Sequence, residues 1–187
     1  MVGKFQLMVK TYPNGGLSSH MDCMEAGDEL NFKHIPFNVK IQYPFKSRHV
    51  LMLVGGTGIA PMIQALHSLL GNKDDKTVVT MLYGSRKEGD ILARDTLGRW
   101  EDGSGGRFKV VNVLSQEDAG SRWEGERGVI DRGLIEKYMG GRGTEDTMVF
   151  VCGPEGMYES LCGPRGEEEV RGVLGDMGWG TRGVYKF

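Results

Sequence analysis

Four consecutive residues, Gly55-Gly56-Thr57-Gly58, have the small size and the hydroxyl group that suit contact with a phosphorylated ligand. They follow the apolar run 49–54 directly and precede apolar residues at helical spacing. Glycines let the backbone approach a ligand closely, and free N–H groups at the start of a helix attract phosphate. Pro61 stands in place of the third glycine of the GxGxxG pattern. The pattern therefore indicates either a diphosphate site or a tight strand–helix turn without a ligand.

The segments around this turn alternate between apolar runs and helical patterns. Uninterrupted apolar runs are typical of strands covered on both faces, and their alternation with helices indicates βαβ units and a parallel sheet. We expect residues 48–187 to form one such α/β domain. The expected strands are 49–54, 77–83, 108–114 and 147–152, and the expected helices are 59–70, 91–100, 129–139 and one that begins near Glu155.

The first 47 residues have a different pattern. Residues 5–10 and 29–33 are predicted to be strands, and Ser18 is placed to cap a short helix that ends at Met24. Residues 34–47 are expected to be a connector. This is too little structure for an independent β-barrel, so residues 1–47 are predicted to be a partial domain.

Composition excludes several other classes of protein. A net charge of −2 gives no electrostatic reason to expect nucleic acid or an anionic membrane as a partner. The three cysteines form no CxxC pair, which favours a reduced, cytoplasmic setting. No His/Cys spacing suits a metal site, and no run of about 18 apolar residues is present to span a bilayer. We expect a monomer in the cytoplasm, or on the cytosolic face of an organelle membrane if a longer product carries an anchor.

Three further motifs accompany the glycine turn in GGTGIAPMIQALHSLL (residues 55–70). They are YGSRKEGDILARDTL (83–97), VFVCGPEGMYESL (149–161) and the terminal Phe187. In this order they resemble the NADH-cytochrome b5 reductase group of the ferredoxin-NADP reductase superfamily, which includes the reductase domain of nitrate reductase. The resemblance covers most of the chain. It implies a Rossmann-like NAD-binding domain, preceded by part of an antiparallel β-barrel that binds FAD.

The resemblance also implies roles for individual residues. Thr57 and Cys152 would lie near the nicotinamide, with Cys152 positioning the ring rather than acting as a nucleophile. Phe187 would cover the flavin or control access of the nicotinamide. The alternatives are a small buried core residue for Cys152 and a disordered tail for Phe187. The residues implied to bind the dinucleotide are Gly55, Gly56, Thr57, Gly58, Ala60, Pro61, Ser85, Arg86, Ser115, Gln116, Cys152, Gly153, Pro154 and Met157.

The pair Ser115-Gln116 bears on the choice between NADH and NADPH. NADPH-using relatives place a Ser-Arg pair here to hold the 2′-phosphate, and a neutral amide lacks that charge. Glu117 or Asp118 would suit the free ribose of NADH. Arg86 could still reach a phosphate from the neighbouring loop. We predict a preference for NADH.

The segment KTYPNGGLSS (residues 10–19) resembles the second flavin motif of the family, GxxS. By this resemblance Gly15, Gly16, Leu17 and Ser18 would contact the FAD diphosphate. Met8, Lys10 and Tyr12 would line the flavin or its ribitol. The first flavin motif, Arg-x-Tyr-Ser/Thr, does not occur in this sequence, so retention of FAD is left open.

Two functions follow as expectations. The first is an NADH-dependent flavoprotein oxidoreductase that passes electrons through FAD to a one-electron haem acceptor such as cytochrome b5. The second is a stand-alone NAD(H)-binding module that no longer holds FAD and is not a competent reductase.

Overall fold

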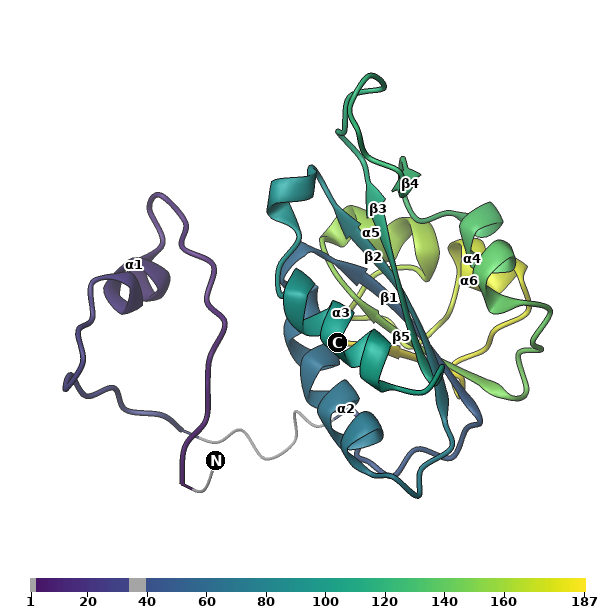
Figure 1. Cartoon of the computed structure of the whole chain (residues 1–187), viewed down its shortest axis with the longest axis horizontal. Helices are drawn as coiled ribbons and strands as arrows, with labels where there is room; N and C mark the ends of the chain where they lie inside the picture. The colour runs from purple at the N-terminus through teal and green to yellow at the C-terminus, as the bar shows by residue number, and fades with distance from the viewer. Residues whose placement is uncertain (1–2, 34–39) are drawn as a thin grey trace. The chain divides into compact units, whose positions relative to one another are not determined.

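The computed structural model describes residues 3–33 and 40–187. The chain divides into two compact units, the second of which runs from Lys40 to Phe187. Most of the regular secondary structure belongs to the second unit (Figure 1). Part of the predicted connector, residues 34–39, lies outside the described residues.

The second unit is built on a six-stranded parallel sheet with the order β4-β3-β2-β1-β5-β6. β1 lies inside the sheet, between β2 and β5, and all seven of its residues are buried, as its apolar sequence predicts. The four predicted strands are confirmed, and the short strands β4 and β6 add to them. The strands are β1 (His49–Gly55), β2 (Val78–Ser85), β3 (Phe108–Leu114), β4 (Glu126–Arg127), β5 (Thr147–Cys152) and β6 (Val184–Lys186).

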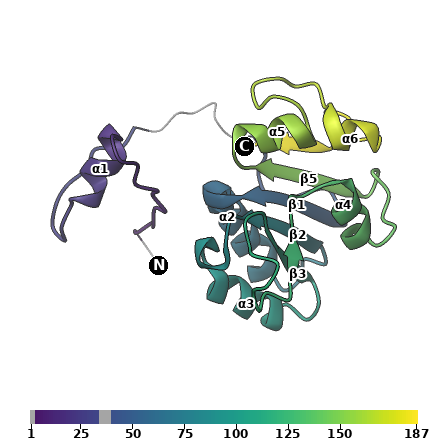
Figure 2. The same ribbon diagram turned by 90° about the horizontal axis from the view of Figure 1, so that it is seen from above.

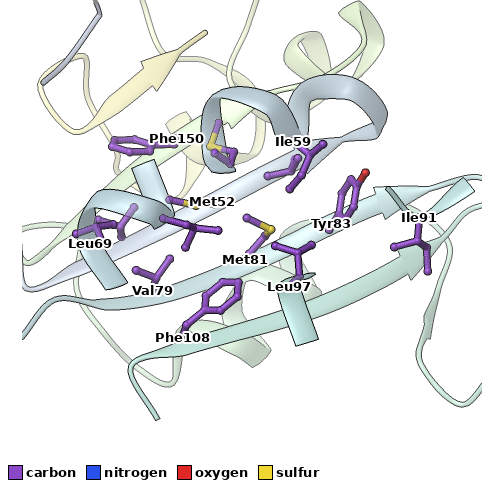
Figure 3. Close-up of a cluster of buried hydrophobic side chains, with 14 of the residues drawn as sticks. Met52, Ile59, Leu69, Val79, Met81, Tyr83, Ile91, Leu97, Phe108 and Phe150 are labelled. Atoms are coloured by element: carbon purple, nitrogen blue, oxygen red, sulfur yellow. The ribbon is translucent and has the colours of Figure 1, made fainter. Parts of the chain in front are cut away.

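Helices cover both faces of this sheet (Figure 2). Val50, Met52 and Val54 face the apolar side chains of α2 and α3, in the cluster drawn in Figure 3. Leu51 and Leu53 point to the opposite face, where α4, α5 and α6 pack. The helices are α2 (Ile59–Gly71), α3 (Arg94–Gly103), α4 (Arg132–Met139), α5 (Glu155–Leu161) and α6 (Gly172–Asp176), with 3₁₀ turns η1 (Gly56–Gly58) and η2 (Glu88–Asp90).

Two predicted helices begin later than the sequence suggests. The helix expected from Ile91 begins at Arg94, because Ala93 before it has a left-handed backbone with φ of 55°. The helix expected from Val129 begins at Arg132, where the carboxylate of Asp131 accepts a hydrogen bond from Leu134 N at 2.9 Å. Local capping geometry decides both starts.

The end of the predicted connector belongs to the second unit. Ile41, Tyr43 and Phe45 pack against its core. The ring of Phe45 lies 5.2 Å from that of Phe150, centroid to centroid, in an edge-to-face contact. This unit therefore begins before residue 48, the predicted start of the dinucleotide domain.

The first unit contains one helix, α1 (Gly16–Asp22), and no strand within residues 3–33. The predicted strands 5–10 and 29–33 are therefore not formed, and no partial β-barrel is seen among these residues. A strand requires a hydrogen-bonded neighbour, and an isolated pair of strands is marginal in water. The rings of Phe5 and Phe32 do meet edge to face, with centroids 5.5 Å apart.

Helix α1 also departs from its predicted ends. Gly15 rather than Ser18 is the N-cap residue, and the helix ends at Asp22 rather than Met24. Ser18 lies inside the first turn, where its Oγ accepts a hydrogen bond from Tyr12 N at 3.3 Å. Among the residues that the structure describes, no helix combines the length and the apolarity needed to cross a bilayer.

Candidate functional site

Two of the predicted motifs meet at the carboxyl ends of β1 and β5. A Cβ atom on Gly58 would lie 2.1 Å from the carbonyl oxygen of Cys152, and one on Gly55 would lie 2.7 Å from Cδ of Pro154. A Cβ atom on Gly153 would lie 2.6 Å from Sδ of the flexible Met157 side chain and 3.2 Å from the backbone nitrogen of Gly55. A side chain is least tolerable at position 58, because there the two turns pack backbone to backbone.

Gly56 differs from its neighbours in the turn. Its φ is +52°, which glycine adopts readily, and a Cβ atom there would meet nothing within 4 Å. Thr57 beside it is partly exposed, and Ala60 in the first turn of α2 is exposed. Since the first N–H groups of a helix lack intrahelical acceptors, the turn combines open space with free donors. A diphosphate fits this arrangement.

The buried Tyr83 of β2 supports the turn from below, and the sequence analysis did not single it out. Its hydroxyl donates a hydrogen bond to the carbonyl oxygen of Gly56 at 3.0 Å and accepts one from Leu92 N at 3.3 Å. Burial raises the pKa of this phenol, which keeps it protonated and able to donate. An aromatic residue in an apolar run is typical of the hydrophobic core. Only the position of Tyr83 directly before Gly84, near the end of the strand, could have suggested that it supports the turn.

The loops after β2 and β3 bring together the residues predicted to read the adenosine ribose. Ser115 N donates to the carbonyl of Ser85 at 3.0 Å, and Gln116 N donates to that of Arg86 at 2.8 Å. The Ser85 hydroxyl is buried and has no hydrogen-bond partner. Arg86 forms an exposed ion pair with Asp90, with Nε and Oδ2 3.4 Å apart. This acidic partner competes with any phosphate for the guanidinium.

Glu117 has a structural contact of its own. Its carboxylate accepts a hydrogen bond from Glu88 N at 3.3 Å, at the start of η2. The loop after β3 is thereby joined to the loop after β2. Asp90, which pairs with Arg86, and Glu117 both add negative charge to these two loops, which disfavours a 2′-phosphate.

Cys152 ends β5 and pairs in register with Val54 of β1, directly before the glycine turn. Its side chain is half-buried, and desolvation raises the pKa of the thiol. The thiolate is therefore scarce at neutral pH, as expected for a residue that is not a nucleophile. The predicted place of Cys152 beside the nicotinamide stays a prediction.

Phe187 is anchored, so the alternative of a disordered tail is wrong. Its N–H donates to the carbonyl of Val151 at 3.0 Å, and the hydroxyl of Tyr158 donates to its carbonyl oxygen. Its ring lies 5.3 Å from that of Phe150, centroid to centroid. The predicted role of Phe187 over a flavin ring stays a prediction.

The residues predicted to bind FAD lie together in the first unit. The N–H of Gly15 donates to the carbonyl of Tyr12 at 2.9 Å, which closes a tight turn before α1. The ammonium of Lys10 lies 5.0 Å from the centroid of the Tyr12 ring. The Ser18 hydroxyl already accepts the Tyr12 N–H, so its contact with FAD stays a prediction, as do those of Met8, Gly16 and Leu17.

A parallel sheet covered on both faces by helices, with a glycine turn at the carboxyl end of a central strand, defines a Rossmann-like dinucleotide-binding domain. Residues 52–163 match the family described as oxidoreductase NAD-binding domain, and the chain belongs to this family.

The chain is also similar to several fungal proteins. It is 36% identical to the NADH-cytochrome b5 reductase 2 of Chaetomium globosum over 99% of this chain and 53% of that protein. It is 37% identical to the protein of the same name from Coccidioides immitis over 99% of this chain and 57% of that protein. The chain thus spans little more than half the length of these curated relatives.

Solved structures show the same fold. The cytochrome b5 reductase domain of Ulva prolifera nitrate reductase matches 92% of this chain and 66% of that chain, with a TM-score of 0.67 at 24% identity. The CS-b5R domains of human Ncb5or in the NAD⁺ form match 94% of this chain and 46% of that chain, with a TM-score of 0.69 at 25% identity.

Proposed function

We propose that this chain binds NADH at the glycine turn and acts as the dinucleotide-binding part of an NADH-dependent flavoprotein oxidoreductase. The observation that carries the proposal is the geometry of Gly56. Its φ is positive, and the position that a Cβ atom would take lies in open space beside the first turn of α2. The name of the chain's fungal relatives, NADH-cytochrome b5 reductase 2, supports a haem protein such as cytochrome b5 as the electron acceptor. A monomer in the cytosol remains our expectation.

The chain's own residues would bind and orient the dinucleotide. Backbone N–H groups from Thr57 onward would contact the diphosphate, while Thr57 and Cys152 would place the nicotinamide above the carboxyl ends of β1 and β5. FAD, when bound, supplies the chemistry that accepts a hydride and releases single electrons. Placement matters because an error of about 1 Å can cost on the order of 100-fold in rate.

Preference for NADH over NADPH follows from charge. Gln116 is neutral, and the nearest cation, Arg86, is paired with Asp90. A 2′-phosphate would therefore have to compete with Asp90 for Arg86, and position 116 offers it no charge. Equal dissociation constants for the two nucleotides would contradict this part of the proposal.

The second candidate is an NAD(H)-binding module that does not hold FAD. It is favoured by the absence of any strand within residues 3–33, where part of the flavin barrel was predicted. The absorption spectrum and ferricyanide reduction by NADH, with and without added FAD, separate the two. Turnover with a flavin spectrum supports the reductase, whereas NADH binding by a colourless protein without turnover supports the module.

The binding proposal is tested by Gly56→Ala, with Gly105→Ala as the control. Both glycines have positive φ, +52° and +62°, and both face open space, so the backbone strain is matched. Gly105, however, precedes β3 at the opposite end of the sheet. We expect NADH affinity to fall more than about tenfold in Gly56→Ala only, because its methyl group occupies space needed for close approach. Equal affinities in the two variants would refute the assignment.

A further inference from the structure

We propose that Tyr83 is a positioning residue for the nucleotide diphosphate, acting through the Gly56–Thr57 peptide. The inference rests on the proposed function and deepens it. It names the side chain that fixes a backbone donor in the direction of the ligand.

Tyr83 is held at the boundary between the core and the turn. It is fully buried in β2, where it pairs in register with Val54, and its ring lies among apolar side chains with the hydroxyl at the edge of the cluster (Figure 3). That hydroxyl reaches the carbonyl oxygen of Gly56 at 3.0 Å. The side chain therefore joins the apolar core to the most open position of the turn.

Peptide geometry converts this contact into the direction of a donor. In a trans peptide the carbonyl of one residue and the N–H of the next point in opposite directions within one plane. Because the Gly56 carbonyl points toward the buried Tyr83, the N–H of Thr57 must point away from the core. The Gly56–Thr57 peptide could also rotate away from this orientation easily, because glycine is conformationally permissive. The N–H of Ile59 also donates to the Gly56 carbonyl within η1. Loss of the Tyr83 hydroxyl would therefore remove one of the two partners of this carbonyl and loosen the direction of the Thr57 donor.

The second hydrogen bond fixes the direction of the hydroxyl proton. Leu92 N donates to the Tyr83 oxygen at 3.3 Å, so the proton is left to donate to Gly56. Ala93, the next residue, has φ of 55° and ends the loop that begins after β2. One hydroxyl thus joins the turn after β1 to the loop after β2.

The test compares Tyr83→Phe with Tyr43→Phe in the full chain. Tyr43 is a matched control because its hydroxyl also has two partners, Asp75 at 2.9 Å and Asn72 at 2.8 Å, in the segment that precedes β2. Calorimetric titrations would use NADH and ADP-ribose. We expect both dissociation constants to rise about tenfold in Tyr83→Phe, as for the loss of one oriented charge-assisted hydrogen bond, and not to change in Tyr43→Phe.

A spectroscopic readout separates positioning from a merely structural role. In the wild type the Thr57 amide resonance should shift on addition of ADP-ribose, and this shift should be lost or much smaller in Tyr83→Phe. If Tyr83→Phe does not fold, the inference is still tested by measurements on the wild type. Its Tyr83 hydroxyl proton must exchange slowly and show a nuclear Overhauser effect to Gly56, and its Thr57 amide must respond to ADP-ribose. Absence of either overturns the inference.

The two proposals fail in different ways. If the wild type binds neither NADH nor ADP-ribose, the proposed function fails, and the inference fails with it. If the wild type binds both and Tyr83→Phe binds them equally well, with the same shift at Thr57, only the role of Tyr83 is refuted.

Discussion

At the scale of single residues, the glycines of the turn serve two different purposes. Gly55 and Gly58 are needed for packing, because a side chain at either position would collide with the turn after β5. Gly56 is needed for its backbone conformation and for the space in front of it. The sequence predicts the turn and its possible ligand, but it does not separate these purposes, since the contact with Cys152 and Gly153 comes from tertiary structure.

Replacement of Gly58 by Ala should therefore destabilise the fold itself. The new methyl group would lie 2.1 Å from a backbone oxygen that cannot move independently, and overpacking of this kind costs roughly 3 kcal/mol. Gly98→Ala is the control, since Gly98 lies inside α3 with nothing within 4 Å of its Cβ position. That change should stabilise the protein by about 0.5–1 kcal/mol through helix propensity. Urea unfolding measures both, and equal midpoints would contradict the packing account.

At the scale of elements, the strands buried on both faces are the most predictable part of the molecule. β5 has the predicted bounds, because its apolar run is typical of a strand covered on both faces. β3 also has the predicted bounds, although Lys109 is exposed and Asn112 interrupts its apolar residues. β4 and β6 were missed because two or three residues carry no periodicity, and they form only where β3 and β5 offer a free edge. The predicted strands of the first unit fail for the complementary reason that no paired neighbour is present within residues 3–33.

The first residue of β1 gives the sheet a pH dependence. His49 is buried between the hydroxyl groups of Thr147 and Thr80, with nitrogen–oxygen distances of 3.3 and 3.0 Å. Burial, and secondarily the charge of Arg142, lowers its pKa to about 4. The folded protein holds the ring neutral, whereas the unfolded chain binds a proton below about pH 6.5. Stability present above pH 6.5 is therefore lost as the pH falls toward 4, by about 3 kcal/mol.

His49→Gln should remove this component of the acid sensitivity. The free energy of unfolding of the variant should fall less than that of the wild type between pH 6.5 and 4. His67→Gln is the control, because His67 is exposed on α2 and should leave the wild-type slope intact. Parallel pH profiles for the wild type and His49→Gln would show that the ring is not held neutral.

At the scale of the whole molecule, the chain consists of two units, and only one of them is built around a sheet with an apolar core. The Lys40–Phe187 unit contains the sheet, both apolar clusters and the candidate dinucleotide site. In the other unit large apolar side chains are exposed, among them Phe5, Leu17 and Phe32. The sequence motifs predicted the dinucleotide domain because each motif lies at the end of a strand. The motif in residues 10–19 did not predict the local structure of the first unit, because a motif does not supply the neighbouring strands that a barrel needs.

A chain reduced to residues 40–187 should therefore keep its fold and its affinity for NADH. Its thermal unfolding should remain cooperative, and its dissociation constant for NADH should agree with that of the full chain within about twofold, since every residue assigned to the dinucleotide site belongs to the Lys40–Phe187 unit. Any flavin bound by the full chain should be lost with residues 1–39. Loss of NADH affinity in the shortened chain would show that the first unit contributes to the site.

The most direct measurement is a calorimetric titration of NADH into the folded chain of 187 residues. The geometry at Gly56 predicts saturable binding of one nucleotide per chain, with weaker binding of NADPH. If neither reduced nucleotide produces heat while circular dichroism shows the chain to be folded, the glycine turn is only a connection between β1 and α2.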